Sequence, residues 1–174
     1  MNSIDGFGGH PVQAGPIPEV AVPPGWTAWC DGSALPNPGR MGWGVVLVAP
    51  DGRRHALSGS GGAAIGCNDE AELRGVMAAL AALRAHGAGA AVVCCDNSVV
   101  VAQLGGAVDG GRAVRPIARL AGRFDEARAA LRSLADVRVV WIPAHRNREA
   151  DALARAALGL TTPRPVAPRH KKRR

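Results

Sequence analysis

Apolar positions recur with two different periods along the chain, and the change of period separates strands from helices. Short apolar runs predict strands at 27–32, 41–49, 90–95 and 137–142, and a weaker alternating run predicts one at 53–60. Apolar residues at helical spacing predict helices at 69–86, 97–104, 114–134 and from residue 147 onward. Three strands therefore precede a series of helix and strand units. This order predicts an α/β fold: a mixed five-stranded sheet, antiparallel meander plus parallel strands, with helices on both faces.

Glycine and proline mark the connections and the ends of the chain. The first strand is expected to end at Asp31, and a tight loop rich in glycine and proline is expected from Gly32 to Gly39. A second loop is expected at 59–66. Residues 1–24 contain many glycines and prolines without periodicity, which predicts a flexible leader. We expect one folded domain at 25–159, followed by a basic, disordered tail at 160–174.

The net charge of +7 is concentrated at the end of the chain, because six positive side chains lie in 160–174. Such a tail is typical of a contact with a polyanion, and equally of a solvated end that only aids solubility.

The four cysteines have no zinc-site spacing, and three of them lie in apolar strand-like runs. No signal peptide and no membrane-spanning run is visible, so we expect a cytoplasmic protein without a membrane partner.

Four carboxylates stand at the ends of predicted elements. Two follow apolar strands and two lie in first turns of helices: Asp31, Glu72, Asp96 and Asp151. Each has an ordinary explanation as well as a functional one. Asp69-x-x-Glu72 fits a capping box, Asp96 fits a helix N-cap, and Asp151 could form a surface pair with Arg155.

The spacing around these acids resembles that of the type 1 ribonuclease H family. D-G-S-x-x-x-N-P-G-x-x-G-x-G begins at Asp31, N-x-x-x-E-L ends in Glu72-Leu73, Asp96 follows the fourth strand, and N-x-x-A-D-x-L-A contains Asp151. The match covers about residues 27 to 158. The resemblance implies a ribonuclease H-like fold and an endonuclease that hydrolyses the RNA strand of RNA/DNA hybrids, leaving 5′-phosphate and 3′-hydroxyl ends.

Converging carboxylates would repel one another unless cations neutralised them, and Mg²⁺ prefers such oxygen ligands. The resemblance implies two Mg²⁺ ions, with Mn²⁺ as a substitute. It implies that Asp31 bridges both ions and that Asp151 completes the site of the ion that activates water. Glu72 and Asp96 would hold the ion nearer the leaving 3′ oxygen. His145 matches an auxiliary catalytic histidine in the family, although a lone surface histidine often has no function.

The resemblance also implies which residues contact the hybrid. Four positions match residues that line the RNA strand in the family: Gly32, Ser33, Asn37 and Asn68. Asn37 could also be a turn former and Asn68 a helix cap. A helical stripe could bind phosphates or be a solvated face: Arg112, Arg115, Arg119 and Arg123.

Some positions depart from the family pattern. Cys67 stands where a threonine often contacts a DNA phosphate, no asparagine lies between residues 98 and 147, and the link at 105–113 is too short for the basic protrusion of some members. Two alternatives stay open: another metal nuclease of this fold that acts on DNA, or a non-catalytic module that binds hybrids or RNA. We expect a monomer.

Overall fold

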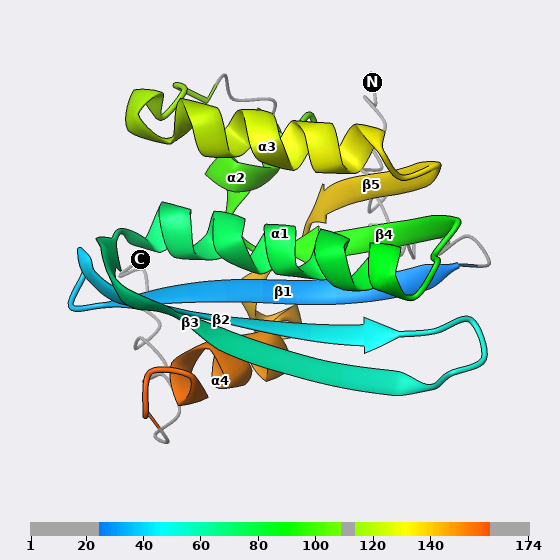
Figure 1. Cartoon of the computed structure of the whole chain (residues 1–174), viewed down its shortest axis with the longest axis horizontal. Helices are drawn as coiled ribbons and strands as arrows, with labels where there is room; N and C mark the ends of the chain where they lie inside the picture. Colours follow the sequence, from blue (N-terminus) through cyan, green and yellow to red (C-terminus); the bar gives the residue numbers. More distant parts are fainter. Residues whose placement is uncertain (1–24, 109–113, 161–174) are drawn as a thin grey trace, which may run out of the picture.

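The computed structural model describes residues 25–108 and 114–160. Within these residues five strands form one sheet: β1 (Trp26–Leu35), β2 (Gly39–Val48), β3 (Arg54–Gly66), β4 (Ala90–Cys95) and β5 (Asp136–Trp141). The helices are α1 (Asn68–Ala85), α2 (Ser98–Gln103), α3 (Ala121–Arg132) and α4 (Arg148–Ala156), with 3₁₀ turns η1 (Ala118–Leu120) and η2 (Ala144–Arg146) (Figure 1).

The sheet has the order β3-β2-β1-β4-β5, which places β1 at its centre. β1, β2 and β3 pair antiparallel, whereas β4 pairs parallel to β1 and β5 parallel to β4. The predicted mixed sheet of a meander plus parallel strands is confirmed. β4 is buried along nearly its whole length, as expected for a parallel strand covered on both faces.

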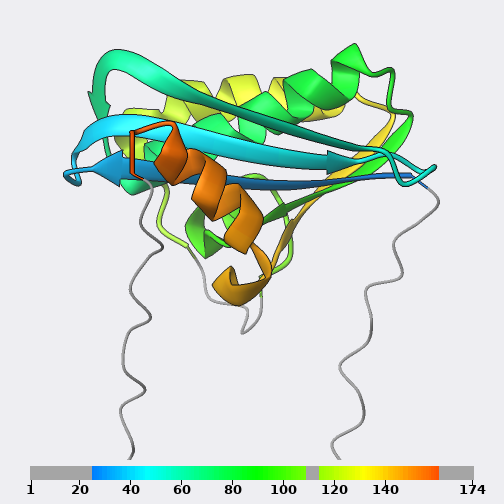
Figure 2. The same cartoon turned by 90° about the horizontal axis from the view of Figure 1, so that it is seen from below.

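Helices cover both faces of the sheet, and the main core lies under α1 and α3. Figure 2 shows the sheet edge-on, with α1 and α3 on one side and α4 on the other. The helical repeat of α1 places four fully or almost fully buried side chains against the sheet: Leu73, Val76, Leu80 and Leu83. Phe124 of α3 joins the same core. This packing fixes the first turns of α1 over the centre of β1.

Two predicted loops are strand in the structure. β1 continues through Gly32 and Ser33 to Leu35, and β3 continues to Gly66, where Ile65 pairs with Arg40 of β2. A ladder uses only backbone groups, so the glycine and serine residues that indicate a loop pair here because β2 lies alongside them. The turn between β1 and β2 is reduced to residues 36–38.

The helix predicted at 114–134 begins later than expected. A 3₁₀ turn at Ala118–Leu120 leads into α3 at Ala121. Pro116 disfavours helical backbone in Arg115, the residue before it. Arg115 therefore precedes the helix, and the predicted arginine stripe is not one continuous helical face. Arg112, the leader at 1–24 and residues 161–174 of the tail lie outside the described residues.

No helix within 25–108 and 114–160 combines the length and the apolar composition that crossing a membrane requires.

Candidate active site

Three carboxylates meet at one end of the central strands. Asp31, Glu72 and Asp96 each offer an oxygen atom, and these atoms all lie within 4.8 Å of one another. Asp31 comes from β1, and Asp96 follows directly after β4. Because Cys30 and Cys95 are paired positions of two parallel neighbours, the residues after them emerge side by side. Helix α1 adds Glu72 from above the same point.

Burial gives this cluster unusual electrostatics. Asp31 is 2% exposed and Glu72 is 9% exposed. Burial raises the pKa of the Glu72 carboxyl well above its ordinary value, and the neighbouring charge of Asp31 raises it further, against the opposing effect of the Gly32 N–H. Crowded, poorly hydrated carboxylates are a suitable donor set for a hard divalent cation, which would relieve their repulsion.

Glu72 faces the sheet rather than the start of its own helix. Its Oε2 accepts a hydrogen bond of 3.1 Å from Gly32 N and lies 3.9 Å from the Cys95 thiol that donates to it. The N-cap of α1 is Cys67, without a side-chain cap bond, so the capping-box interpretation is wrong. The carboxylate of Asp69 accepts instead from the Asn97 amide.

Gly32 allows this approach of strand and helix. A Cβ at this position would lie 2.0 Å from the carbonyl carbon of Ala71 and 2.1 Å from the backbone nitrogen of Glu72. Only a residue without a side chain fits there, and its N–H then reaches Glu72 directly. Gly32 therefore allows Glu72 of α1 to lie close to Asp31 of β1.

Asp96 is held at both its side chain and its backbone. Its Oδ1 accepts from Asn147 Nδ2 at 3.0 Å, and its carbonyl oxygen accepts from Trp141 Nε1 at 3.1 Å. The N-cap of α2 is Asn97, whose Oδ1 accepts from two backbone N–H groups of that helix. The interpretation of Asp96 as a plain N-cap is therefore wrong.

Asp151 belongs to the helix on the opposite face of the sheet. α4 packs closely on β2, because a Cβ on Gly44 would lie 2.4 Å from the carbonyl oxygen of Ala150. Asp151 is half-buried, its Oδ1 is buried, and its N–H donates to the carbonyl of Asn147 one turn earlier. Among the described residues the compact acidic group comprises the other three carboxylates and does not extend to Asp151.

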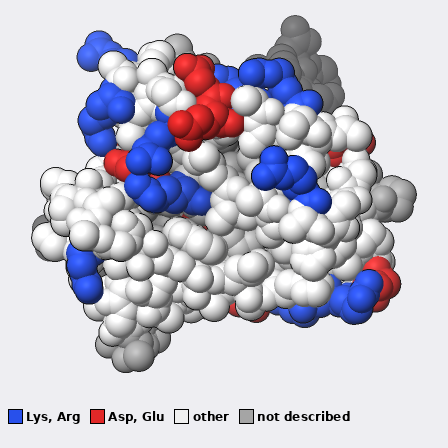
Figure 3. Space-filling model, viewed as in Figure 1, with Lys and Arg blue, Asp and Glu red and all other residues white. Residues whose placement is uncertain are grey.

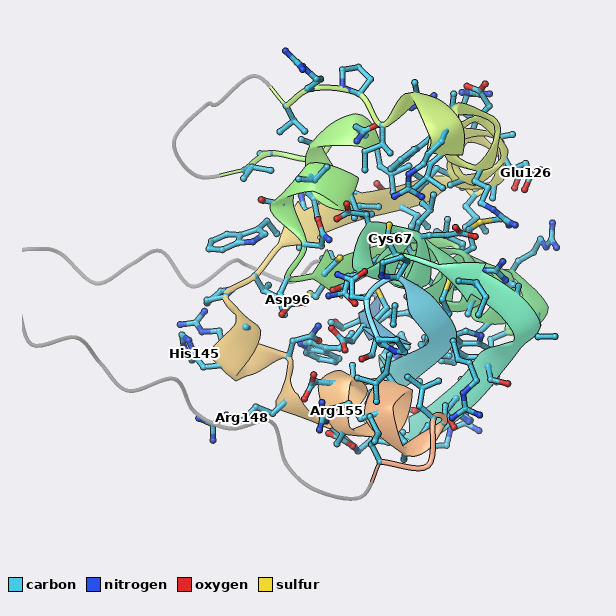
Figure 4. The ribbon with its side chains drawn as sticks, turned by 90° about the vertical axis from the view of Figure 1, so that its left-hand side faces the viewer. Cys67, Asp96, Glu126, His145, Arg148 and Arg155 are labelled. Carbon is cyan, nitrogen blue, oxygen red and sulfur yellow. The ribbon has the colours of Figure 1, made fainter. Side chains whose placement is uncertain are left out.

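Figure 4 looks onto the edge of the sheet where the cluster lies. Asp96 is near the centre of this view, and His145 and Arg148 lie to the side of the η2–α4 segment. His145 is exposed and points outward. The structure thus places the histidine at the rim of the site and not in contact with its buried acids.

The β1–β2 turn and the start of α1 are tied together beside the acids. Asn68 Oδ1 accepts from Ala34 N at 2.9 Å, and Asn37 Oδ1 accepts from Asn68 N at 3.2 Å. Asn68 is therefore not the cap of its own helix; Asn37 bonds the first helical N–H from the turn. Ser33 is buried, whereas both asparagines are exposed. These contacts make one rigid ledge next to the cluster.

Basic side chains gather at the start of α1, on the face shown in Figure 3. Arg119 donates to the Sγ of Cys67. Arg123 and Arg74 both approach Glu70, at 3.3 and 3.2 Å. Arg115 is exposed and lies outside the helix. Arg119 and Arg123 are thus the two arginines of the predicted stripe whose contacts with the start of α1 are defined.

Sequence reasoning did not select Asn147 or Trp141 as residues that hold Asp96. Asn147 stood in the last motif only as a fixed letter before Asp151, and Trp141 as an apolar strand residue. A polar side chain four positions before a candidate catalytic acid is a usable signal, but its partners are 117 and 51 residues away in sequence. No local pattern contains that information.

Comparison with known proteins agrees with this geometry. The family described as reverse transcriptase-like matches residues 29–157. Ribonuclease H of Roseobacter denitrificans is 34% identical over 148 residues, which cover 75% of this chain and 93% of the relative.

Two solved structures share the fold. Ribonuclease H1 from Halobacterium salinarum has a TM-score of 0.68 and 30% identity, covering 77% of this chain and 97% of its own. LC11-RNase H1 in complex with an RNA/DNA hybrid has a TM-score of 0.65 and 26% identity, covering 77% and 96%. With the family match, the relatives and the sheet order in agreement, this chain belongs to the type 1 ribonuclease H family of ribonucleases.

Proposed function

We propose that this protein is an endonuclease that hydrolyses the RNA strand of RNA/DNA hybrids by a two-metal-ion mechanism and leaves 5′-phosphate and 3′-hydroxyl ends. The observation that carries the proposal is the buried group of Asp31, Glu72 and Asp96 with oxygens within 4.8 Å. The substrate is supported by the similar LC11-RNase H1, which was solved in complex with an RNA/DNA hybrid.

The residues present fit a pair of divalent cations. Asp31, Glu72 and Asp96 would hold Mg²⁺, or Mn²⁺ in its place, and Asp151 would complete the set from α4. Such ions activate water and stabilise the attacking and leaving oxygens at phosphorus. Burial, and after it the charge of Asp31, raises the pKa of the Glu72 carboxyl, and a bound cation would offset both effects, which is consistent with the proposed site.

The chain's own groups would orient the hybrid over this site. Asn37 and Asn68, which are bonded to each other beside the acids, and Gly32 and Ser33 of β1 would present amide and backbone groups to the RNA strand and its 2′-hydroxyls. Arg119, with Arg115 nearby in sequence, would contact phosphates. His145 at the exposed rim would accept or release a proton without binding a cation.

A cleavage assay tests the proposal. A labelled RNA/DNA hybrid, duplex DNA and duplex RNA are each incubated with the protein and Mg²⁺, and the ends of the products are determined. We expect cleavage of the hybrid within its RNA strand, and loss of that cleavage in Asp96→Asn, because the amide keeps the shape but not the charge. Asp136→Asn, an exposed aspartate at the start of β5, is the matched control.

The alternatives predict different outcomes of the same assay. Cleavage of duplex DNA in preference to the hybrid would identify a DNA nuclease of this fold. Tight hybrid binding without cleavage in Mg²⁺ or Mn²⁺ would identify a non-catalytic module. Either result overturns the proposed function.

A further inference from the structure

We propose that Asn147 is a positioning residue that orients the carboxylate of Asp96 for metal binding. The inference rests on the proposed function and deepens it, because it adds a residue outside the acidic set. Asn147 would act through Asp96 and would not itself touch an ion or the substrate.

The placement of Asn147 is unusual for the N-cap residue of a helix. It is 1% exposed, although its neighbours Arg146 and Arg148 are exposed. An asparagine at an N-cap usually accepts a hydrogen bond from its own helix, yet the side chain of Asn147 makes no such bond to α4. The side chain is directed into the protein instead, at the expense of local helix stability.

Two acceptors inside the protein use the two N–H groups of the amide. Asn147 Nδ2 donates to the carbonyl oxygen of Cys30 at 2.9 Å and to Asp96 Oδ1 at 3.0 Å. Cys30 is the residue before Asp31, and Asp96 is the residue after β4. One amide therefore connects the backbone next to the first acid with the side chain of the third.

The chemical type of the donor matters for a cation site. A primary amide carries two N–H groups on one nitrogen, which matches a pair of acceptors. It is also neutral, so it fixes one oxygen of Asp96 and leaves the negative charge of the carboxylate available. A lysine or arginine in this position would neutralise that charge and compete with the cation. Residues that orient metal ligands in this way typically change metal affinity about 10- to 100-fold when removed.

The test measures Mn²⁺ binding directly, in the absence of any substrate, by titration calorimetry on the full chain. We expect Asn147→Ala to weaken Mn²⁺ affinity about 10- to 100-fold. In cleavage assays at saturating Mn²⁺, kcat should fall while KM for the hybrid stays close to wild type. Gln103→Ala is the control: its amide oxygen accepts from Ile117 N at 3.2 Å away from the acids, so its loss should lower the melting temperature without changing Mn²⁺ affinity.

A double-mutant cycle with Asp96→Asn separates positioning from general destabilisation. If Asn147 acts through the Asp96 carboxylate, Asn147→Ala should add little to the loss of affinity in the Asp96→Asn background. An equal additional loss there would overturn the proposal, and so would wild-type Mn²⁺ affinity in folded Asn147→Ala.

A measurement on the wild type covers the case in which the variant does not fold. Mg²⁺ titration should shift the side-chain amide resonances of Asn147, because the charge of its partner carboxylate becomes neutralised. Resonances that stay unshifted while Mg²⁺ binds would refute the role of Asn147 but not the proposed function. Wild-type protein that neither binds Mn²⁺ nor cleaves a hybrid would refute both.

Discussion

Replacing Gly32 by alanine should push helix α1 away from strand β1 and so move Glu72 away from Asp31. The added Cβ would lie 2.0 Å from the carbonyl carbon of Ala71, whereas real Cβ contacts essentially never fall below 3.0 Å. The atoms it meets belong to the backbone of α1 and cannot rotate away. β1 and α1 must therefore move apart by at least about 1 Å.

The expected magnitude follows from that displacement. Overpacking of a rigid contact costs about 1–3 kcal/mol, and the upper end applies here because both partners are backbone. For a domain of this size we expect the melting temperature to fall by roughly 10 °C. The 3.1 Å bond from Gly32 N to Glu72 would break, and a 1 Å shift of catalytic groups lowers the rate about 100-fold.

Thermal melts and hybrid cleavage rates are the measurements. Gly89→Ala is the matched control, because its Cβ would meet nothing within 4 Å and its backbone is compatible with alanine. A Gly32→Ala protein that melts with the control and cleaves at a comparable rate would refute the close approach of β1 and α1.

Three further predictions concern charge. The pKa of Glu72 in the folded protein lies above its ordinary value of 4.5. In EDTA, the free energy of unfolding should therefore fall as pH rises from about 4.5 through the folded pKa, by about 1.4 kcal/mol for each unit of the shift. Melting curves recorded across this pH range should show no such fall in Glu72→Gln. A pH dependence of stability identical to that of the wild type would contradict the prediction. Mg²⁺ or Mn²⁺ should raise the melting temperature of the wild type, while Ca²⁺ should bind with little cleavage; cleavage that persists in excess EDTA would exclude the two-metal proposal. Removing residues 160–174 deletes six positive charges, so the dependence of log K on log salt for hybrid binding should become shallower at unchanged turnover, and an equal slope would show that the tail does not bind phosphates.

Periodicity alone predicted the elements in which tertiary contacts do not override the local preference of the sequence for helix or strand. α1, β4, α2, β5 and α4 lie within one or two residues of the expected bounds, because their apolar repeats agree with the faces that they bury. The ends of β1 and β3 could not be predicted in this way. Gly32 and Gly66 indicate loops locally, and only the strand beside them makes them part of the sheet.

In the site, too, the sequence predicted some features, whereas others depend on contacts between residues far apart in the chain. The resemblance to the ribonuclease H family implied that the acids converge, and the structure brings Asp31 and Asp96 together from two neighbouring parallel strands. The capping roles were wrong, because the side chains of Asp69 and Asn68 bond Asn97 and Ala34 instead of the helix start beside them. The role of Asn147 required coordinates, since an asparagine before a helix looks the same whether it caps that helix or reaches across the fold.

The bond from Asn147 to the carbonyl of Cys30 spans 117 residues of sequence, nearly the whole length of the described chain. During synthesis, a chain that ends before residue 147 contains Asp31, Glu72 and Asp96 but lacks the amide that joins two of them. The proposed hydrolytic centre is therefore completed only when the last helix docks. We therefore expect a chain truncated before residue 147 to cleave hybrids far more slowly than the full chain even after its sheet has formed, because it lacks Asp151 as well as this amide.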